Sequence, residues 1–514
     1  MYDFVRTKIR CFVRTKKSRT KVTEKIRLTN IQQWPSGTPL FYVSEKSFEQ
    51  SDNSVSERLI YHAEYGILRS ESYSQIQLTF GRVKSLIERK KYLDSLIRRQ
   101  WNHRIKVITG IRRCGKSTLL FGLFREYLLA SGVPEKNIIL LALDDDTGEQ
   151  YRDPYRLSAY VRELASDPAQ KYYVFIDEIQ FAISREELRQ KDQPVRLYSV
   201  LNGFLRLQNI DVYVTGSNSK MLSKDISTEF RGRGDEVKVY PLSFREFYDA
   251  YGRDRLEAYN EYSMYGGMPY LFTLDRDDDK YRYLSDLFEE IYFKDIEERY
   301  SIALPGVLRE LTSDLCSSVG SLTNASKISR TLQSVKHMKV DNETISIYLK
   351  YLTESFLFSE AVRYDIKGKK YFDYPSKYYC TDIGLRNVRL GLRQQEETHI
   401  MENLIYNELV VRGFHVDVGV IPIAEKNPEG KREQRNCEID FIATSGSKRY
   451  YIQSALSMDD PEKAKTEVRP LNAVRDSFKK IIVSKSYGKS WTDEKGILRI
   501  NIIDFLLDEA SLDR

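Results

Sequence analysis

Residues 110–117 have the residue types and the spacing of a loop that binds phosphate. The stretch Gly-Ile-Arg-Arg-Cys-Gly-Lys-Ser fits the pattern G-x-x-x-x-G-K-[ST]. Its two glycines allow backbone torsions that turn successive N–H groups towards one anion, and the start of a following helix adds partial positive charge. Lys116 is long enough to reach the β- and γ-phosphates of a nucleotide, and the Ser117 hydroxyl is suited to ligate Mg²⁺. The expected nucleotide-binding residues are Gly110, Ile111, Arg112, Arg113, Cys114, Gly115, Lys116, Ser117 and Thr118.

Two acidic residues follow a second apolar stretch, at a distance expected for the partner of such a loop. Asp177 ends the run KYYVFID, and Glu178 comes directly after it. In a phosphate-loop protein the first carboxylate holds Mg²⁺ together with Ser117, and the second polarises the attacking water as a general base. A purely structural role is the weaker interpretation, because adjacent buried carboxylates are costly without a cation. Asn218 follows the next apolar run and is expected to orient the same water or to sense the γ-phosphate, although a lone asparagine in a turn is usually a capping residue.

The residues around these groups predict an α/β fold. Short apolar runs are typical of buried parallel strands, and helical patterns separate them in the chain. In a doubly wound parallel sheet ligands bind at the carboxyl ends of the strands, so the phosphate loop and the acidic residues should meet at one edge. The predicted strands are Ile105–Thr109, Asn137–Leu143, Lys171–Gln180 and Asp211–Gly216.

Several segments of the chain occur, in the same order, in a known family. They are GIRRCGKSTLL, YVFIDEIQ, VTGSNSKML, RGRGDEVKVYPLSFREFY and YGGMPYL. With them the chain resembles uncharacterised bacterial and archaeal AAA-type ATPases, from about Val83 to the C-terminus. In that family the ATPase core is followed by a domain of unknown function. The resemblance implies ATP and Mg²⁺ as cofactors, and Arg231 or Arg233 as an arginine finger that serves a neighbouring subunit of a homo-oligomer. The alternative is an ordinary solvated arginine pair.

The region after the ATPase core is expected to contain a helical lid and a winged helix. Residues 241–304 are mostly helical in pattern, with a break at Gly266-Gly267-Met268-Pro269. Beyond them, helices are predicted at Leu322–Leu332 and Asp341–Thr353, followed by strands at Phe356–Tyr364 and Lys370–Asp373. Helix, helix and basic hairpin are the parts of a DNA-binding wing, although many winged helices contact protein alone. The residues expected to neutralise DNA phosphates are Arg330, Lys336, Lys367, Lys369 and Lys370.

The last part of the chain is predicted to be a separate α/β unit that resembles the restriction-endonuclease-like fold. A helix at Met401–Arg412 carries Glu402, and a strand at Cys437–Thr444 carries Glu438 and Asp440. That chemistry needs clustered carboxylates for Mg²⁺ and a lysine beside the attacking water. Here the usual E-x-K is Gln453-Ser454-Ala455, so a degenerate fold used for binding is expected and nuclease activity is not.

Composition and charge restrict the classes of protein to which the chain can belong. The 514 residues are 41% hydrophobic, and no apolar run approaches the roughly 18 residues of a membrane helix. The five cysteines lack C-x-x-C spacing, so a cytoplasmic location is expected and a disulfide framework or zinc site is not. Cys114 lies at a helix N-terminus, where a thiol pKa tends to fall. Of the net charge of +7, residues 1–27 contribute +8, so the body of the protein is not basic.

Residues 1–80 lack a sustained periodicity and are expected to be a disordered basic and polar extension. A nucleic-acid or membrane arm, a targeting peptide, or sequence upstream of the true start are the alternatives. The predicted domains are 1–80, the ATPase core 81–240, the lid 241–304, the winged-helix-like region 305–392 and the nuclease-like unit 393–514.

Together these features predict an enzyme that hydrolyses ATP and couples the reaction to DNA or to a protein partner, with no membrane contact. The first alternative is a low-turnover nucleotide switch that serves as an interaction module. The second is an ATP-dependent nuclease.

Overall fold

The computed structural model forms two compact units, Met1–Val83 and Lys84–Arg514. In the second unit it describes residues 87–184, 186–187, 195–217, 233–372, 375–393, 396–426, 432–486 and 488–514. In the first it describes two antiparallel pairs of short strands, β1 (Cys11–Arg14) with β2 (Arg19–Val22) and β3 (Ile31–Gln33) with β4 (Pro39–Phe41). The other residues of 1–80, which were expected to be disordered, lie outside the described residues.

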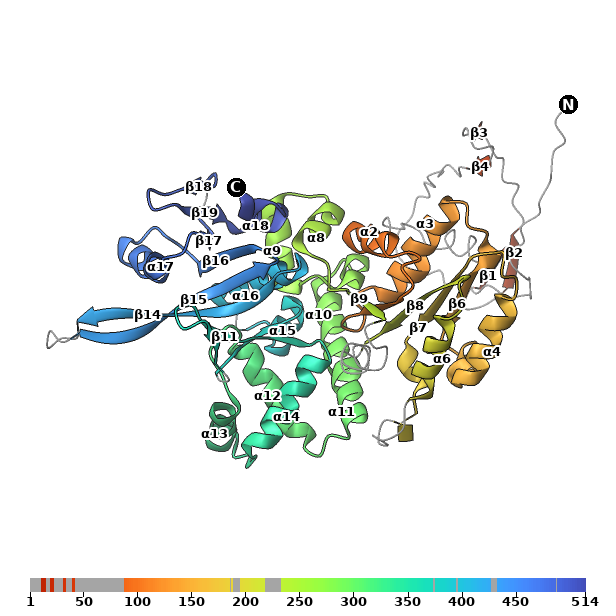
Figure 1. The fold of residues 1–514 in the computed structure, drawn as a ribbon, viewed down its shortest axis with the longest axis horizontal. Helices are drawn as coiled ribbons and strands as arrows, with labels where there is room; N and C mark the ends of the chain where they lie inside the picture. Colours follow the sequence, from red (N-terminus) through yellow and green to blue (C-terminus); the bar gives the residue numbers. More distant parts are fainter. Residues whose placement is uncertain are drawn as a thin grey trace. The chain divides into compact units, whose positions relative to one another are not determined.

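A five-stranded parallel sheet forms the first half of the larger unit (Figure 1). Its strand order is β6-β7-β8-β5-β9, so the chain crosses the sheet and returns, as in a doubly wound fold. This confirms the predicted α/β class, with β9 as a strand that the sequence analysis did not include. The strands are β5 (Ile105–Thr109), β6 (Ile138–Ala142), β7 (Tyr172–Asp177), β8 (Ile210–Gly216) and β9 (Gly234–Lys238).

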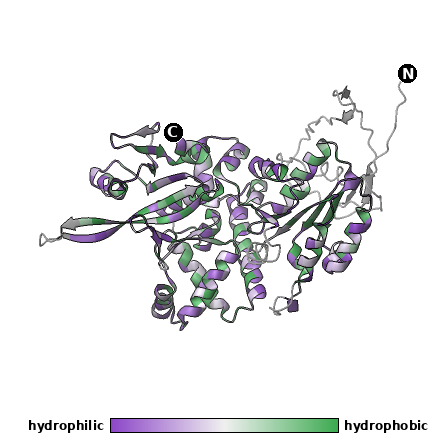
Figure 2. Ribbon diagram, viewed as in Figure 1, coloured by the Kyte–Doolittle hydropathy of each residue, from purple (hydrophilic) through white to green (hydrophobic). Residues whose placement is uncertain are grey.

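Helices cover both faces of this sheet, which explains why its central strands are apolar throughout. Every residue of β5, β7 and β8 is buried, and the hydrophobic colour follows these strands in Figure 2. One face packs against α2 (Lys90–Arg98), the π-helical segment η1 (Thr118–Phe124) and its continuation α3 (Arg125–Ala130). The other packs against α4 (Pro154–Leu164) and α6 (Arg196–Phe204). Short 3₁₀ turns lie at η2 (Glu135–Asn137), η3 (Glu149–Arg152) and η4 (Ile179–Ala182).

Residues 244–354 are almost entirely helical. The first helix begins with a reciprocal capping box in which Ser243 accepts from the Glu246 backbone and Glu246 accepts from that of Ser243. The predicted cap at Asp341 is also present, because its carboxylate accepts from the Thr344 backbone N–H. The helices are α8 (Phe244–Tyr251), α9 (Arg255–Tyr265), η6 (Pro269–Thr273), α10 (Asp277–Asp286), η7 (Leu287–Phe293), α11 (Lys294–Tyr300), α12 (Pro305–Ser317), α13 (Ala325–Lys336) and α14 (Asn342–Glu354).

The predicted wing differs from the structure, because its first strand is split between two sheets. β10 (Phe358–Ala361) pairs with β13 (Lys377–Cys380) next to the helices. β11 (Arg363–Asp365) instead pairs with β12 (Lys370–Tyr371) on one side and with β14 (His415–Lys426) on the other. The basic hairpin is therefore the edge of the C-terminal sheet rather than a free wing, and the predicted boundary at residue 392 cuts through that sheet.

The C-terminal sheet has eight strands in the order β12-β11-β14-β15-β16-β17-β19-β18. β14 and β15 are long, and together they extend as an arm away from the rest of the unit (Figure 1). The remaining strands are β15 (Arg432–Ser445), β16 (Lys448–Ala455), β17 (Lys479–Ser484), β18 (Trp491–Thr492) and β19 (Ile497–Asn501). The accompanying helices are α15 (Ile383–Arg389), α16 (Glu397–Val411), α17 (Pro461–Ala473), α18 (Ile502–Leu507) and η8 (Ser511–Asp513).

Two hydrophobic cores cross the predicted domain boundaries. One joins β5 and the helix after the phosphate loop to α10, α12, α14 and α15. Another joins α8 and α9 to α16, α18 and the strands of the C-terminal sheet. Residues 84–514 are accordingly one compact unit, and the boundaries at 240, 304 and 392 separate no independent cores. Among the described helices, none has the length and apolar character needed to cross a membrane.

Candidate functional site

The loop between β5 and η1 has the backbone that binding of phosphate requires. Gly110 has φ of +144°, and a Cβ at this position would lie 2.1 Å from the Val239 carbonyl oxygen, so no other residue fits. Gly115 has φ of +99°, and the non-glycine Arg113 also lies in the left-handed region at φ +64°. Alternating torsions of this kind turn backbone N–H groups into one concave surface.

Lys116 lies inside the loop rather than in solvent. Its side chain is buried, and its ammonium donates hydrogen bonds to the carbonyl oxygens of Gly110 at 3.0 Å and Ile111 at 3.1 Å. Both of these acceptors are neutral, and within the described part of the chain the Lys116 ammonium forms no ion pair with a carboxylate. An anion such as a nucleotide phosphate would be a stronger acceptor than either carbonyl.

Ser117 and Asp177 lie near each other at the carboxyl edge of the sheet, and their role in holding Mg²⁺ stays a prediction. The Thr215 hydroxyl at the end of β8 donates a hydrogen bond to the Asp177 carboxylate, and the Ser117 hydroxyl lies near the same carboxylate. Burial raises the pKa of Asp177 above its ordinary value, and the two hydroxyls partly offset the shift. A buried carboxylate beside a hydroxyl is a pair of hard oxygen donors, which fits Mg²⁺.

Glu178 follows directly and is held by neighbours that the sequence analysis did not single out. Its backbone has φ of +50°, and its N–H donates to the Thr215 hydroxyl at 3.0 Å. The Gln180 amide donates to the Glu178 carboxylate, and the Ser217 hydroxyl lies 3.5 Å from the same oxygen. The left-handed backbone and these hydrogen bonds hold Glu178 at the carboxyl edge of the sheet, directly after Asp177.

A buried arginine outside the motif ties the loop to its surroundings. Arg89, at the start of α2, donates from Nη1 to the Cys114 carbonyl at 2.9 Å and from Nη2 to the Tyr240 carbonyl at 2.6 Å. Its Nε also pairs with Glu246 at 3.0 Å, in the first turn of α8. The guanidinium therefore connects the phosphate loop to the first helix of the predicted lid.

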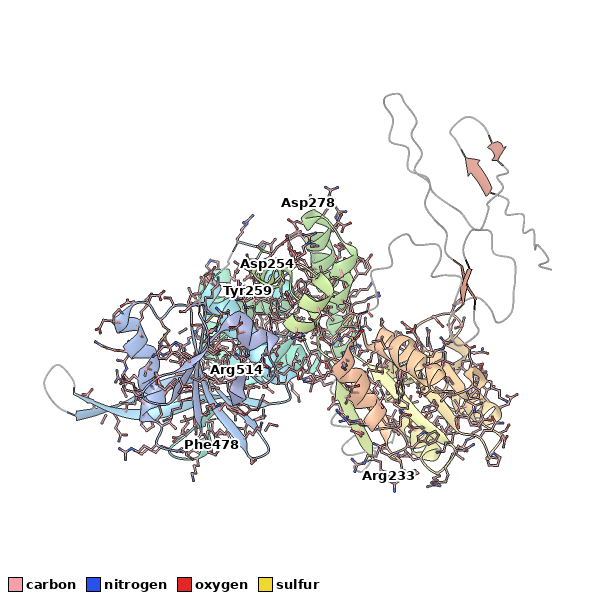
Figure 3. All side chains as sticks on the ribbon, turned by 90° about the horizontal axis from the view of Figure 1, so that it is seen from above. Arg233, Asp254, Tyr259, Asp278, Phe478 and Arg514 are labelled. Atoms are coloured by element: carbon pink, nitrogen blue, oxygen red, sulfur yellow. The ribbon has the colours of Figure 1, made fainter. Side chains whose placement is uncertain are left out.

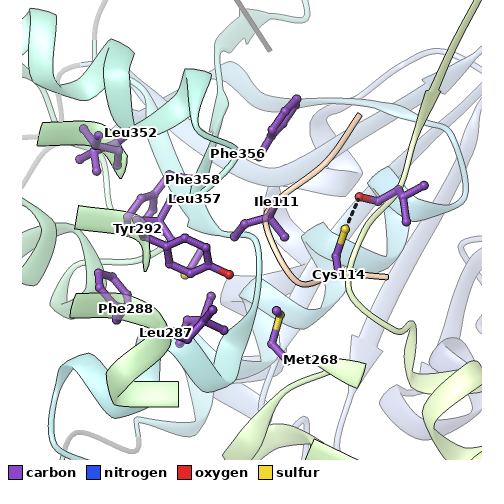
Figure 4. Close-up of a cluster of buried hydrophobic side chains, with 14 of the residues drawn as sticks. Ile111, Cys114, Met268, Leu287, Phe288, Tyr292, Leu352, Phe356, Leu357 and Phe358 are labelled. Atoms are coloured by element: carbon purple, nitrogen blue, oxygen red, sulfur yellow. Dashed lines mark hydrogen bonds between the residues drawn. The ribbon is translucent and has the colours of Figure 1, made fainter. Parts of the chain in front are cut away.

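The loop also packs directly into the helical region. Ile111 and Cys114 are fully buried in the same core as Met268, Leu287 and Tyr292 (Figure 4). This burial raises the pKa of the Cys114 thiol, whose Sγ lies 3.5 Å from the Val239 carbonyl oxygen. The expectation of a lowered thiol pKa was wrong, because desolvation outweighs the nearby Lys116 and Arg89 charges.

Arg112 forms a polar connection between the loop and the helical region. Its Nη2 pairs with Asp295 of α11 at 3.0 Å, and its carbonyl accepts from the Tyr292 hydroxyl at 3.1 Å. Its Nε lies 3.3 Å from the Ser217 hydroxyl at the end of β8. One phosphate-loop residue thus contacts both the edge of the sheet and the helix that follows η7.

The remaining predicted residues lie in three different settings. Thr118 is the exposed first residue of η1. Arg233 is exposed at the start of β9, where its carbonyl accepts from Ile105 at the amino edge of the sheet, opposite the phosphate loop (Figure 3). It is therefore outside the site of its own chain, and its role in a neighbouring subunit stays a prediction. Asn218 and Arg231 lie outside the described residues.

In the C-terminal unit, Glu402, Glu438 and Asp440 converge as predicted, but around a lysine. Lys377 of β13 pairs with Glu402 and Glu438, each at 2.8 Å, and with Asp440 at 3.5 Å. Neither Gln453 nor Ala455 supplies a further anion, as expected from the sequence. The described residues contain no group of His, Cys, Asp and Glu arranged to hold a metal ion.

The sequence analysis did not identify several residues whose roles depend on contacts with other parts of the chain. Thr215 and Ser217 lie within the segment VTGSNS, whose strand-end position was a signal for them. Lys377 is a single lysine before the apolar run YYC, and a lysine facing the inside of such a strand needs anionic partners. Arg89, Tyr292 and Asp295 carried no comparable signal, because their partners are distant in the chain.

Comparison with known proteins agrees with this arrangement. A family model described as an AAA domain matches residues 102–248, and a model described as a domain of unknown function matches residues 256–396. An uncharacterised protein of Haemophilus influenzae is 35% identical over 429 residues, which cover 82% of this chain and 99% of that protein. An uncharacterised protein of Methanocaldococcus jannaschii is 25% identical over 390 residues, covering 73% of this chain and 79% of that protein.

The similarity to solved structures is far weaker. AMPPCP-bound DnaA from Aquifex aeolicus is 14% identical, with a TM-score of 0.27, and the match covers 51% of this chain and 86% of that one. The identity to the Haemophilus influenzae protein, by contrast, extends over almost its whole length. The chain therefore belongs to a family of uncharacterised bacterial and archaeal AAA-type ATPases, in which an AAA domain is followed by a domain of unknown function.

Proposed function

We propose that this protein binds ATP with Mg²⁺ at the phosphate loop, hydrolyses it, and uses the nucleotide state to act on a DNA or protein partner. The observation that carries the proposal is the meeting of Lys116, Ser117, Asp177 and Glu178 at one edge of the sheet. The family membership supports nucleotide binding, and the coupling to a partner is the part that we add.

Each residue has a distinct task in this scheme. The backbone N–H groups of the loop bind the phosphate oxygens, and Lys116 exchanges its two carbonyl acceptors for them. Ser117 and Asp177 would hold Mg²⁺, which neutralises charge on the β- and γ-phosphates. Glu178 takes the proton of the attacking water, in line with its half-buried position directly after Asp177 at the edge of the sheet.

Coupling is proposed to run through Arg112. This side chain holds Asp295 with a charged pair while its loop is within reach of the phosphates. Binding of a polyanion offers the guanidinium a stronger partner than a single carboxylate. Asp295 then remains with its second partner, Arg299, at 2.5 Å. The position of α11 relative to the loop would therefore depend on whether nucleotide is bound.

The low-turnover switch is the second candidate, and one observation favours it. One Glu178 carboxylate oxygen accepts hydrogen bonds from Gln180 and Ser217, which hold the side chain in place instead of leaving it free to turn towards an attacking water. A site of this kind binds ATP and turns over slowly until the Gln180 contact is broken. The ATP-dependent nuclease is not favoured, because Lys377 lies among the C-terminal carboxylates.

Steady-state ATPase activity and equilibrium ATP binding, measured together, test the proposal. Lys116→Ala should weaken ATP binding about 100-fold, since charged hydrogen bonds of up to about 3 kcal/mol are lost. Glu178→Gln should keep the affinity and lower turnover by about 100-fold or more. Equal turnover in Glu178→Gln and the wild type would remove Glu178 from catalysis. Tight binding without measurable turnover in the wild type would favour the switch.

The same assay, run with and without duplex DNA, separates the two kinds of partner. If DNA is the partner, it should raise turnover, and the stimulation should fall steeply with salt. Replacing Lys367, Lys369 and Lys370 by Gln should then reduce the stimulation, because these exposed residues lie at the edge of the C-terminal sheet. An absence of stimulation at low salt would favour a protein partner.

A further inference from the structure

A buried lysine lies at the centre of the acidic cluster in the C-terminal half. The Lys377 side chain is 4% exposed, and its ammonium is within 2.8 Å of carboxylate oxygens of both Glu402 and Glu438. Asp440 lies slightly farther away, at 3.5 Å. An ammonium has three N–H donors, and here three carboxylates from two other elements, α16 and β15, surround it.

The other polar contacts of the cluster leave little room for a second cation. The Tyr379 hydroxyl donates to the same Glu402 oxygen at 2.7 Å, and the second Asp440 oxygen accepts from the Ser454 backbone at 2.9 Å. On the far side, a Cβ at Gly320 would lie 2.9 Å from Glu402, so the chain closes against this carboxylate. While the Lys377 ammonium is present, these carboxylates therefore have no place for a divalent metal ion.

The Lys377 side chain stays positively charged although it is buried. Burial lowers its pKa, but the attraction of Glu402, Asp440 and Glu438 outweighs burial, so the pKa lies above its ordinary value. The ammonium thus remains charged while it is buried. Without it, three carboxylates would share a poorly solvated site with no counter-ion, which is strongly unfavourable.

We propose that Lys377 is a built-in cation that occupies the position of a divalent metal ion, and that its removal would create a metal-binding site in this pocket. The ammonium neutralises the carboxylates and holds three elements together without any exogenous ion. In the native protein this cluster therefore has a structural role, in which it connects three elements, and it needs no metal. This inference is independent of ATP hydrolysis.

The cluster around Lys377 connects two parts of the chain, of which only the first matches the domain of unknown function. Lys377 lies within residues 256–396, which match the domain of unknown function. All three carboxylates follow that segment in the chain. The cluster is thus an electrostatic link between the matched domain and the remainder of the chain, in addition to the shared hydrophobic core that joins α8 and α9 to α16.

Binding of Mn²⁺ to the full-length, nucleotide-free protein tests the proposal. All proteins should carry Asp177→Asn, so that the cation site of the phosphate loop is removed. Isothermal titration and thermal unfolding then compare the parent with Lys377→Ala, which opens space and removes the charge. The parent should bind no Mn²⁺ in the micromolar range. The Lys377→Ala variant should bind one equivalent and be stabilised by it, with a melting temperature that rises by several degrees.

Two control variants make the result specific. Adding Asp440→Asn to Lys377→Ala should abolish the new binding, because a hard anionic ligand is lost. Lys448→Ala, which removes an exposed lysine paired with Asp513, should create no site. Stoichiometric Mn²⁺ binding by the parent that Asp440→Asn removes would overturn the proposal. A folded Lys377→Ala protein without Mn²⁺ binding would also overturn it.

Should Lys377→Ala not fold, a milder variant gives the same readout. Adding Glu438→Gln to Lys377→Ala removes the most exposed of the three carboxylates, which has 33% of its side chain accessible, and so reduces the repulsion. Refolding of Lys377→Ala that depends on added Mn²⁺ would support the proposal, and refolding that is indifferent to Mn²⁺ would contradict it.

Discussion

At the scale of single residues, Arg112 shows how a variable position of a phosphate loop acquires a second task. The loop pattern requires glycine, lysine and serine but leaves this position free. Here its side chain reaches Asp295 and Ser217, and its carbonyl accepts from Tyr292. A position that is unconstrained for phosphate binding is therefore constrained by the helices that pack on the loop.

Asp295→Asn should uncouple the helical region from the nucleotide while ATP still binds. The pair with Arg112 is partly exposed and contributes on the order of 1 kcal/mol or less, so the fold should tolerate the change. Hydrogen exchange over residues 287–300 is the measurement. In the wild type it should change on addition of ATP, and in Asp295→Asn it should not.

A matched control is available on the preceding helix. Asp278 forms an exposed pair with Arg276 at 3.5 Å and lies at the surface of the molecule (Figure 3). Asp278→Asn should keep the response to ATP. A response of the same size in Asp295→Asn would show that Arg112 does not transmit the nucleotide state.

At the scale of secondary-structure elements, buried caps fix where helices begin. Asp382 is the N-cap of α15 and is almost inaccessible. Its carboxylate accepts from the Gly267 backbone at 2.7 Å and from the Leu385 backbone at 3.2 Å, so it joins α15 to the Gly-Gly turn before η6. Gly266 has positive φ, and a Cβ there would lie 2.2 Å from the carboxylate, so the turn and the cap require each other.

Asp382 should make stability depend on pH in the mildly acidic range. Burial raises its pKa to about 6 from the ordinary 3.8, and the backbone hydrogen bonds only partly offset this shift. Between these values the unfolded chain has released the proton and the native protein still holds it. The contribution of Asp382 is thus fully present below about pH 4 and is lost as the pH rises through about 6, a difference on the order of 3 kcal/mol.

Asp382→Asn provides the comparison for this prediction. Asparagine retains one acceptor oxygen for the cap, does not titrate, and leaves one backbone N–H less well paired. The variant should be less stable overall, and its melting temperature should vary less between pH 4 and pH 6.5. Parallel pH profiles for the variant and the wild type would assign the titration to other groups.

The elements that the sequence predicted well are those whose pattern is local. The strand Ile105–Thr109 was placed correctly at both ends, since an apolar run and the glycine after it define it. The hairpin at 363–371 was predicted as a wing because its alternation and basic turn are local features. Its pairing with β14 depends on residues later in the chain, and no local pattern records that partner.

The same distinction applies to the candidate site. The loop, Asp177 and Glu178 were predicted from motif spacing, because each must stand at a strand end. Arg89 and Lys377 were not, since their roles come from charged partners on other elements. Lys116 was expected to point at phosphate, and the loop carbonyls are its acceptors in this structure.

At the scale of the whole molecule, the larger unit behaves as one body. The hydrophobic core around α8 and α9 is completed by residues of α16 and the C-terminal strands, including Leu404, Ile405 and Phe441. Burying a large apolar side chain contributes about 1.5–3 kcal/mol. Loss of even four such contacts would therefore approach the 5–15 kcal/mol that stabilises an ordinary domain.

Truncation separates the part that can be removed from the part that cannot. A chain that begins at Lys84 should keep the fold and the ATPase activity, because residues 84–514 form a unit with its own cores. A chain that ends at Arg393 should be insoluble or unfolded, because it exposes the apolar face of α8 and α9. Circular dichroism and thermal unfolding of both truncated proteins check the expectation, and a stable 84–393 fragment that unfolds cooperatively would contradict it.

The shared edge of the C-terminal sheet also has a consequence for the order in which the chain is made. On the ribosome, β11 is synthesised before α15, α16 and β14, yet among the described strands it pairs with β14 and with the two residues of β12. Until β14 has been synthesised, the backbone N–H and C=O groups of β11 that pair with it must therefore lack this partner or bond transiently to another part of the chain. The nucleotide-binding half has been synthesised by then, but its helices share cores with the later elements, so nascent chains should bind ATP stably only after the C-terminal sheet has closed.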